Sequence, residues 1–303
     1  MRASRASSAV LALVLVVLVT LAGCGGQEPA PVPDTAAVRF AAYDFSENQI
    51  LVALYAEAAR RAGLRVAVES GVATREVVEP ALEQGVVDVV VDYLGTASQF
   101  LGRAPAGPGE TPEQLHAGLT GVLAERGVTV LDAAPAEDQN GFAVTTAFAA
   151  AHGVGKLSDL AGLANPLVFG GPPECADRPL CIPGLRDVYG LHFAHVIPMP
   201  SRAATVEALT AGEIDVGLLE TTDARVGSAP VLLLLDDRSL QPHENVVPLV
   251  RTAVLDREGD RLRAALDDTS ARLTTQALVA LNRAVELDGL TPAQAADRWW
   301  DAA

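Results

Sequence analysis

Apolar residues recur at helical spacing between residues 50 and 58, at Ile50, Leu51, Leu54 and Ala58. The spacing predicts a helix that starts near Ser46 and ends at Gly63, a typical C-terminal residue of a helix. Ser46 is a suitable N-cap, and Gln49 completes a capping-box pattern. Two aromatic residues, Tyr43 and Phe45, stand directly before this helix. These two rings either pack in the core or contact a ligand.

Apolar strand-like segments and helical patterns alternate along the rest of the chain, and one combination occurs twice. Residues 81–89 and 208–216 each read as a helix end, a glycine and an apolar strand. Tyr93 follows the first copy and Glu220 the second, each five residues after the strand's aspartate. Ligands of open α/β sheets bind beyond the carboxyl ends of strands. We therefore expect Tyr93 and Glu220 to face one another across a cleft.

The order of these segments predicts an α/β protein with two lobes, the first of which is discontinuous. Residues 38–138 and 232–303 form the predicted first lobe, and residues 139–231 are inserted as the second. The apolar segment at 231–237 is interpreted as the strand that returns to the first lobe.

The N-terminus has the pattern of an export signal. Arg2 and Arg5 precede an uncharged segment that ends in Leu-Ala-Gly-Cys at Cys24. This ending resembles a bacterial lipoprotein signal, which implies a signal peptide at 1–23 and a lipid on Cys24. A transmembrane anchor is the alternative. Residues 24–37 are rich in proline and predict a tether that holds the domain off the cell membrane.

Composition excludes some partners. The chain has 303 residues, a formal charge of −16 and a single lysine, Lys156. Nucleic-acid binding needs clustered basic residues, so no nucleic-acid partner is expected.

Two cysteines remain in the mature chain, Cys175 and Cys181. An exported protein meets an oxidising environment, so we expect them to form a disulfide. A metal site that combines them with His192 and His195 is the alternative. We expect no metal and no cofactor.

Enzyme signatures are weak. The chain has no Gly-x-Ser-x-Gly elbow, phosphate loop or dinucleotide fingerprint. Glu220 and Asp223 could serve acid–base catalysis, but paired carboxylates are common in an acidic chain. Export, a membrane tether and two α/β lobes instead favour the capture subunit of an uptake system.

Successive segments resemble one family, the substrate-binding proteins of glycine betaine/carnitine/choline ABC transporters. The resemblance runs from about residue 38 to 298 and includes DFSENQIL, ALEQGVVDVVVDYLGT, APAEDQNGFAVT, IPGLRDVYGLHF, ALTAGEIDVGLLETTD and QPHENVVPLVR. It implies a two-lobe periplasmic-binding-protein-like fold (type II) with its ligand in the interlobe cleft. It also implies an extracytoplasmic protein that passes a quaternary ammonium compound to a permease with its ATPase.

The resemblance also implies the residues of the site, position by position. The family's Tyr-x-x-Thr stands here as Tyr93 and Thr96, and its Asn-x-Tyr as Asn140 and Phe142. The other positions carried over are Arg178 for a ligand carboxylate, and Glu220 and Glu244 where the family has cage tyrosines. A family position before the first helix falls on Tyr43, which implies that Tyr43 points into the cleft while Phe45 packs. The alternative is that both rings lie in the core. His243 is the alternative to Glu244.

The two glutamates leave the ligand open. If both face the cleft, the site favours a net cation such as choline over zwitterionic betaine. A polyamine-like cation, or a sensor outside transport on the same fold, is the alternative function.

Overall fold

The protein is described here by a computed structural model that covers residues 36–102, 110–163 and 166–302. The predicted signal peptide, the lipidation site Cys24 and nearly all of the predicted tether lie outside these residues. Within the described part of the chain, no helix is long and apolar enough to cross a membrane.

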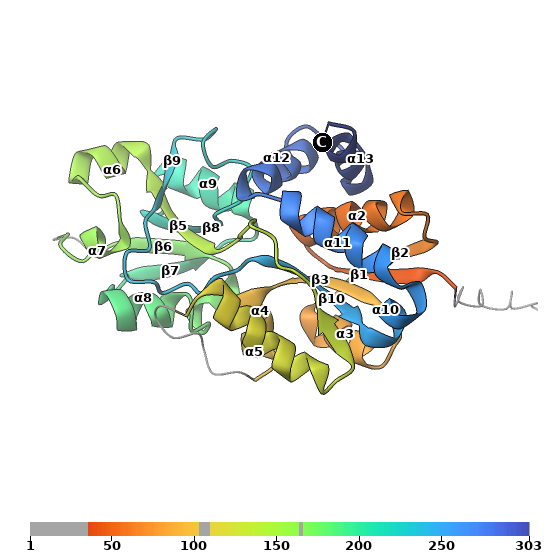
Figure 1. Cartoon of the computed structure of the whole chain (residues 1–303). Coiled ribbons are helices and arrows are strands. Elements are labelled where there is room, and N and C mark those ends of the chain that lie inside the picture. Colours follow the sequence, from red (N-terminus) through yellow and green to blue (C-terminus); the bar gives the residue numbers. More distant parts are fainter. Residues whose placement is uncertain (1–35, 103–109, 164–165, 303) are drawn as a thin grey trace, which may run out of the picture. The chain divides into compact units, whose positions relative to one another are not determined.

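The first of two five-stranded sheets has the strand order β2-β1-β3-β10-β4 (Figure 1). Its strands are β1 (Val38–Tyr43), β2 (Val66–Ala73), β3 (Val89–Tyr93), β4 (Val128–Val130) and β10 (Val246–Arg251). Strand β1 runs parallel to β2 and β3, whereas β10 is antiparallel to β3 and β4. The carboxyl ends of β1 and β3 therefore lie at one edge of the sheet.

Helices cover both faces of this sheet because alternate strand residues point to opposite sides. Phe40 and Ala42 join a core under α2, while Ala41 and Tyr43 join a second core under α3 and α5. The helices are α2 (Ser46–Arg61), α3 (Arg75–Glu83), α4 (Leu94–Phe100), α5 (Pro112–Ala124), α10 (Thr252–Glu258), α11 (Asp260–Arg272), α12 (Thr275–Glu286) and α13 (Pro292–Ala302).

The second sheet has the order β7-β6-β8-β5-β9. Its strands are β5 (Asn140–Thr145), β6 (Val168–Gly171), β7 (His195–Pro198), β8 (Val216–Glu220) and β9 (Val231–Leu234). The helices that accompany it are α6 (Thr146–His152), α7 (Leu157–Leu160), the 3-10 helix η1 (Pro173–Ala176), α8 (Ile182–Tyr189) and α9 (Arg202–Ala211). Two crossing segments join the sheets, before β5 and after β9 (Figure 1).

Two sequence-based expectations about these elements are wrong. The strand at 231–234 pairs with β5 of the second sheet, so the chain does not return to the first sheet at residue 232 but at β10. An apolar run indicates a buried strand, but it does not indicate which strand it pairs with. Helix α2 begins at Ser46 itself, with Phe45 as the N-cap and no side-chain cap. Gly63 follows the helix end with φ of 80°, as expected.

Candidate ligand-binding site

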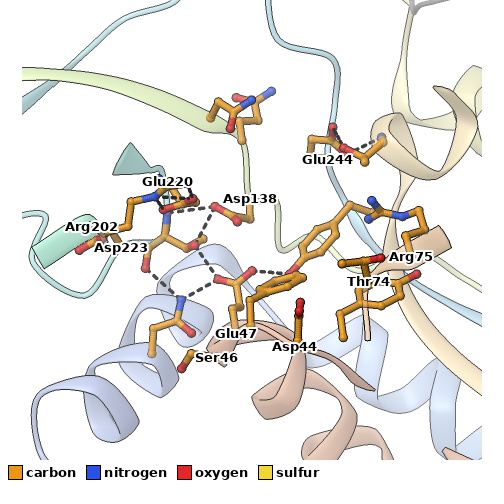
Figure 2. Close-up of a pocket in the computed structure, with 18 of the residues that line it drawn as sticks. Asp44, Ser46, Glu47, Thr74, Arg75, Asp138, Arg202, Glu220, Asp223 and Glu244 are labelled. Carbon is orange, nitrogen blue, oxygen red and sulfur yellow. Dashed lines mark hydrogen bonds and ion pairs between the residues drawn. The ribbon is translucent and has the colours of Figure 1, made fainter. Parts of the chain in front are cut away.

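A cavity of about 720 Å³ lies where the strand ends and crossing segments of the two sheets meet (Figure 2). This volume falls in the ordinary range for small-molecule sites. Tyr93 ends β3 and Glu220 ends β8, and both line the cavity, as the internal repeat predicted. Among the described residues the lining holds nine carboxylic acids and three arginines. The site therefore has a strong excess of acidic groups.

Three aromatic rings form a row on the wall that the first sheet provides. The Phe45 ring centroid lies 6.1 Å from that of Tyr43 and 6.4 Å from that of Tyr93, with nearly parallel planes. Phe45 is 42% exposed, whereas Tyr43 is 2% exposed. The expectation that Phe45 packs is therefore wrong, and the expectation for Tyr43 holds only in part. Tyr43 borders the cavity, but Phe45 presents the open ring.

Tyr43 is held back by a buried polar cluster behind it. Its hydroxyl donates a hydrogen bond to Asp92 over 2.7 Å, and its ring lies 5.0 Å from the Arg75 guanidinium. Arg75 binds the Asp92 carboxylate through two nitrogens, at 2.8 and 2.6 Å. Burial, reinforced by the charge of Asp92, raises the pKa of nearby Glu79 to about 8. Glu79 is therefore mostly neutral at pH 7, and Arg75 balances Asp92.

Phe142 does not reach the cavity, contrary to the expectation. It is 1% exposed and packs in the core of the second sheet, 6.2 Å from the Phe169 ring. Asn140 is the first residue of β5 and lines the cavity. Phe142 lies two residues further along, which places it about 7 Å inside the sheet at the usual strand rise. The ring serves packing and not the site.

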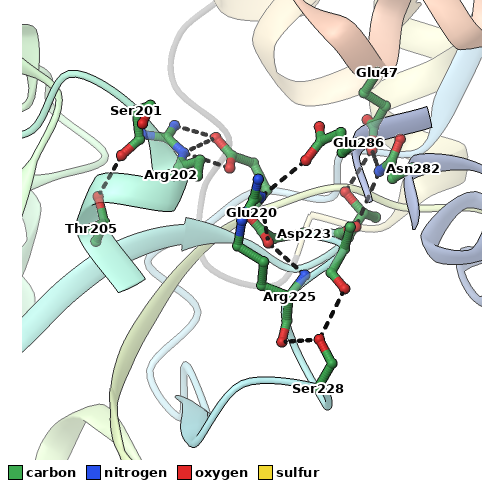
Figure 3. A network of polar contacts seen from close by, with 12 residues as sticks. Glu47, Ser201, Arg202, Thr205, Glu220, Asp223, Arg225, Ser228, Asn282 and Glu286 are labelled. Atoms are coloured by element: carbon green, nitrogen blue, oxygen red, sulfur yellow. Dashed lines mark hydrogen bonds and ion pairs between the residues drawn. The ribbon is translucent and has the colours of Figure 1, made fainter. Parts of the chain in front are cut away.

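Glu220 has a cationic partner that the sequence analysis missed. Arg202, at the start of α9, donates to the Glu220 carboxylate, with Nε 2.7 Å from Oε1 (Figure 3). Both side chains are partly exposed at the cavity wall. The third lining arginine, Arg178, is 67% exposed and lies 3.5 Å from Glu174. The second-sheet wall therefore carries paired charges rather than a bare carboxylate.

Glu244 is buried against the N-terminal part of α4. Its carboxylate accepts hydrogen bonds from the Thr96 backbone nitrogen at 2.9 Å and from the Thr96 hydroxyl at 2.6 Å. Burial raises the pKa of Glu244 to about 7, against the opposing effect of the Thr96 bonds. His243, the alternative, lies 2.9 Å from Glu137 on the other crossing segment. Of Glu244 and His243, it is therefore Glu244 that lines the cavity, together with Thr96.

Glu47 is the centre of a second polar network in the lining. Its carboxylate accepts hydrogen bonds at 2.6 Å from the hydroxyls of Tyr93 and Thr222 and from the Asn282 amide. Tyr93 is thus turned toward Glu47, which explains why its ring is nearly buried. Glu47 lies in the first turn of α2, where an acidic residue ordinarily signals only helix stability, so nothing in the sequence singled it out.

The loop that carries Arg178 is closed by a disulfide between Cys175 and Cys181. Within the described residues, no group of three or more histidine, cysteine, aspartate or glutamate side chains could hold a metal ion. His195 stands in β7, the edge strand of the second sheet.

Comparison with known families decides the identity of this arrangement. The model of the OpuAC family, the substrate-binding domain of ABC-type glycine betaine transport systems, matches residues 36–302. The chain belongs to this family. The resemblance drawn from the sequence motifs is thereby confirmed.

Individual OpuAC-like proteins agree with this assignment. A glycine-betaine-binding protein of Pseudomonas aeruginosa is 27% identical over an alignment of 292 residues, which covers 90% of this chain and 90% of the relative. A crystal structure of a glycine betaine/carnitine/choline ABC transporter protein superposes with a TM-score of 0.77 at 22% identity, covering 88% of this chain and 98% of its own. The crystal structure of lactococcal OpuAC, in a closed conformation with glycine betaine bound, superposes with a TM-score of 0.60 at 18% identity. The superposition covers 88% of this chain and 95% of that protein. The two-lobe α/β fold is confirmed.

The OpuAC family consists of substrate-binding proteins of ABC importers, which are not enzymes and act outside the cytoplasm. For this member the structure brings seven of the eight expected binding residues to one cavity: Tyr43, Tyr93, Thr96, Asn140, Arg178, Glu220 and Glu244. It adds Phe45, which was expected to pack. It also adds Arg75, Arg202 and the Glu47 network, which no sequence pattern indicated.

Proposed function

We propose that this protein captures a quaternary ammonium osmoprotectant, such as choline, glycine betaine or carnitine, and delivers it to a permease and its ATPase. The observation that supports it best is the exposed Phe45 ring beside Tyr43 and Tyr93 in an acidic cavity. A quaternary ammonium group donates no ordinary hydrogen bond, so aromatic faces and carboxylates are its best partners.

Each lining residue then has a role in ligand binding. Phe45 contacts the methyl groups of the cation, and Tyr43 and Tyr93 support it. Asn140 and Arg178 orient the polar end of the ligand from the second sheet. Glu220 and Glu244 supply negative potential at the wall. The ion pair with Arg202 reduces the contribution of Glu220, and the raised pKa of Glu244 reduces its negative charge. The excess of acidic groups favours a net cation over a zwitterion.

A lipid on Cys24 would hold the protein at the outer face of the cell membrane, with residues 24–37 as a tether. The division into lobes is proposed to follow the sheets, with the second lobe running from about residue 139 to the crossing segment after β9. Closure of the lobes around the ligand would present it to the permease.

Titration calorimetry tests this function. A soluble chain that begins at Gly25 contains the whole compact unit of residues 36–303. Choline, glycine betaine, carnitine and spermidine are titrated in parallel. We expect choline to bind most tightly, and binding by none of the quaternary amines contradicts the proposal. Spermidine tests the second candidate, a cation with N–H donors. The buried Asn282 Oδ1 favours it, because this acceptor has no hydrogen-bond partner in the described part of the chain.

Replacing Phe45 with leucine should weaken choline binding about tenfold. Leucine keeps most of the apolar bulk but removes the aromatic face, and cation–π contacts contribute about 0.5–2 kcal/mol. Calorimetric dissociation constants check this. The control is Phe45→Tyr, which keeps the ring and should bind choline within about twofold of the parent. Equal binding by the leucine variant would remove Phe45 from the site.

The Arg202–Glu220 pair should set the balance between cation and zwitterion. Arg202→Gln leaves Glu220 unpaired at the wall and should strengthen choline binding relative to betaine by about threefold, a value suited to a partly exposed pair. Glu220→Gln frees the guanidinium and should shift the ratio in the opposite direction. Both ratios are measured at low ionic strength, and a shift in the same direction for both variants refutes the assignment.

A further inference from the structure

One hydroxyl lies between two carboxyl groups at the edge of the cavity. Thr222 Oγ1 is 2.6 Å from Glu47 Oε2 and 2.7 Å from Asp138 Oδ1. Figure 2 shows Glu47 and Asp138 pointing toward one another, joined by dashed lines through the side chain between them. Glu47 belongs to α2 beside the first sheet, and Thr222 follows β8 of the second sheet. The contact therefore joins the two sheets.

These distances require more protons than the hydroxyl supplies. A threonine hydroxyl carries one proton and can donate to only one of the two oxygens. Two ionised carboxylates at hydrogen-bond distance from one oxygen would leave one of these contacts without a proton. Both contacts are satisfied when one carboxyl group of the pair is protonated and donates to Thr222.

The surroundings identify Asp138 as the protonated group. Glu47 accepts from the Tyr93 hydroxyl and the Asn282 amide in addition to Thr222, and these three donors suit a carboxylate. Asp138 receives weaker hydrogen bonds than Glu47, because the Thr222 backbone nitrogen is 3.3 Å from its carboxyl oxygen. Burial, followed by the charges of Glu47 and Glu220, raises the pKa of Asp138 well above its usual value. Burial also raises the pKa of Glu47, while its three hydrogen bonds oppose the rise.

The other charged groups around the pair are largely engaged with one another. Glu220 is bound by Arg202, and Asp223 lies 3.2 Å from Arg225, which also contacts Glu286 at 3.0 Å (Figure 3). Tyr93, which faces Glu47 from β3, has its pKa raised by burial and by the Glu47 charge, so it stays neutral. No ion pair between Asp138 and a basic side chain occurs among the described contacts. A proton is therefore the balancing charge at this place.

A second observation points to a ligand position beside this pair. Glu47, Asp138, Thr222 and Asn282 all line the cavity. The Asn282 side chain is nearly fully buried, and its Oδ1 has no hydrogen-bond partner within the described residues. Its amide nitrogen donates to Glu47 and to the Thr222 carbonyl, which fixes Oδ1 as the free acceptor. An unpaired buried acceptor in a cavity lining indicates a place where a ligand completes the polar contacts.

We propose that Glu47 and Asp138 form a specificity-determining pair that shares one proton and releases it to solvent when a net cation occupies the cavity. This inference rests on the proposed function. A cation near Tyr93 and Glu47 favours the doubly ionised pair, because opposite charges in a poorly hydrated site interact strongly. A zwitterion brings its own carboxylate and displaces the proton less. The pair thus selects for cations.

The sign of the pH dependence follows from linkage. A ligand whose binding releases protons binds more tightly as the pH rises, by up to about tenfold per pH unit for one proton released. The affinity for choline should therefore rise with pH through the range in which Asp138 holds its proton. The affinity for glycine betaine should rise less.

Calorimetry in two buffers measures the released proton directly. The soluble chain that begins at Gly25 is titrated with choline at pH 7 in phosphate and in Tris, whose ionisation enthalpies differ widely. We expect the apparent binding enthalpy to differ between the buffers by an amount that corresponds to a measurable fraction of a proton released, with a smaller fraction for glycine betaine. Glu244 also lines the cavity with a pKa of about 7 and can contribute to this release, so the same comparison is made in Glu244→Gln.

Two variants assign the proton. In the Glu244→Gln background, Asp138→Asn copies the protonated carboxyl and should abolish the buffer difference and flatten the pH profile. Glu76→Gln removes an acidic residue of the same lining whose pKa is lowered by hydrogen bonds at the start of α3, and it should leave the proton release in place. In the Glu244→Gln background, choline binding without proton release, with proton uptake, or with release that survives Asp138→Asn overturns the inference alone. Failure of every quaternary amine to bind overturns the proposed function as well.

Discussion

Replacing Arg75 with alanine should lower the free energy of unfolding by about 3–5 kcal/mol. Asp92, its partner, has 0% exposure and lies under the cavity with both carboxylate oxygens bound by the guanidinium. Removal of Arg75 leaves the buried carboxylate of Asp92 without a positive partner, beside Glu79. The Tyr43 hydroxyl alone cannot balance this charge. Urea unfolding monitored by circular dichroism measures the loss.

A double variant distinguishes the cost of the unpaired buried charge on Asp92 from the cost of the packing lost with the Arg75 side chain. Arg75→Met combined with Asp92→Asn removes both charges while keeping similar volumes, and it should recover most of the stability that Arg75→Ala loses. A loss below about 1 kcal/mol in Arg75→Ala would show that water already screens Asp92 and that the pair is not a buried one.

Glu244→Gln should remove a pH-dependent loss of stability of roughly 3 kcal/mol between pH 4.5 and 7. The pKa of Glu244 is about 7 in the folded protein, above that of an unfolded glutamate, because the side chain is buried. The folded state therefore keeps a proton that the unfolded state loses. This contribution is complete below about pH 4.5 and disappears as the pH rises through 7.

Unfolding free energies of the parent and the glutamine variant, measured at intervals from pH 4 to 8, check this prediction. Glu79 and Asp138 titrate in both proteins, so the difference between the two curves isolates Glu244. A glutamine at Glu207, an exposed residue of α9, is the matched control and should leave the curve parallel to that of the parent. Parallel curves for Glu244→Gln itself would mean that the pKa of Glu244 is the same in the folded and the unfolded protein.

Much of the fold could be predicted because it depends on local patterns. The periodicity at residues 50–58 predicted α2 to within two residues at its C-terminal end, and the helix-glycine-strand repeat placed Tyr93 and Glu220 at strand ends. Ligand sites of open α/β sheets lie beyond the carboxyl ends of the strands. A cavity shared by Tyr93 and Glu220 could therefore be predicted from the sequence. The succession of motifs was enough for the family, which the OpuAC match confirmed.

The orientation of aromatic side chains was not predictable in the same way. Tyr43 and Phe45 are both aromatic residues next to a helix start. The sequence could not show that a buried carboxylate, Asp92, 49 residues away from Tyr43, holds the tyrosine hydroxyl. Phe142 matched a family position but lies too far inside β5. Which ring is exposed depends on partners that only the packed structure supplies.

The sequence alone thus determined the order of helices and strands, the two-sheet architecture, the family and most of the residues at the site, since these follow from short-range periodicity and motif order. The tertiary structure decided the charges of the site. Arg202 reaches Glu220 across 18 residues, Thr222 reaches Glu47 across 175, and Asn282 reaches Glu47 across 235. Whether a carboxyl group is ionised, paired or protonated depends on its burial and on neighbours brought together by folding, and neither is encoded in local sequence.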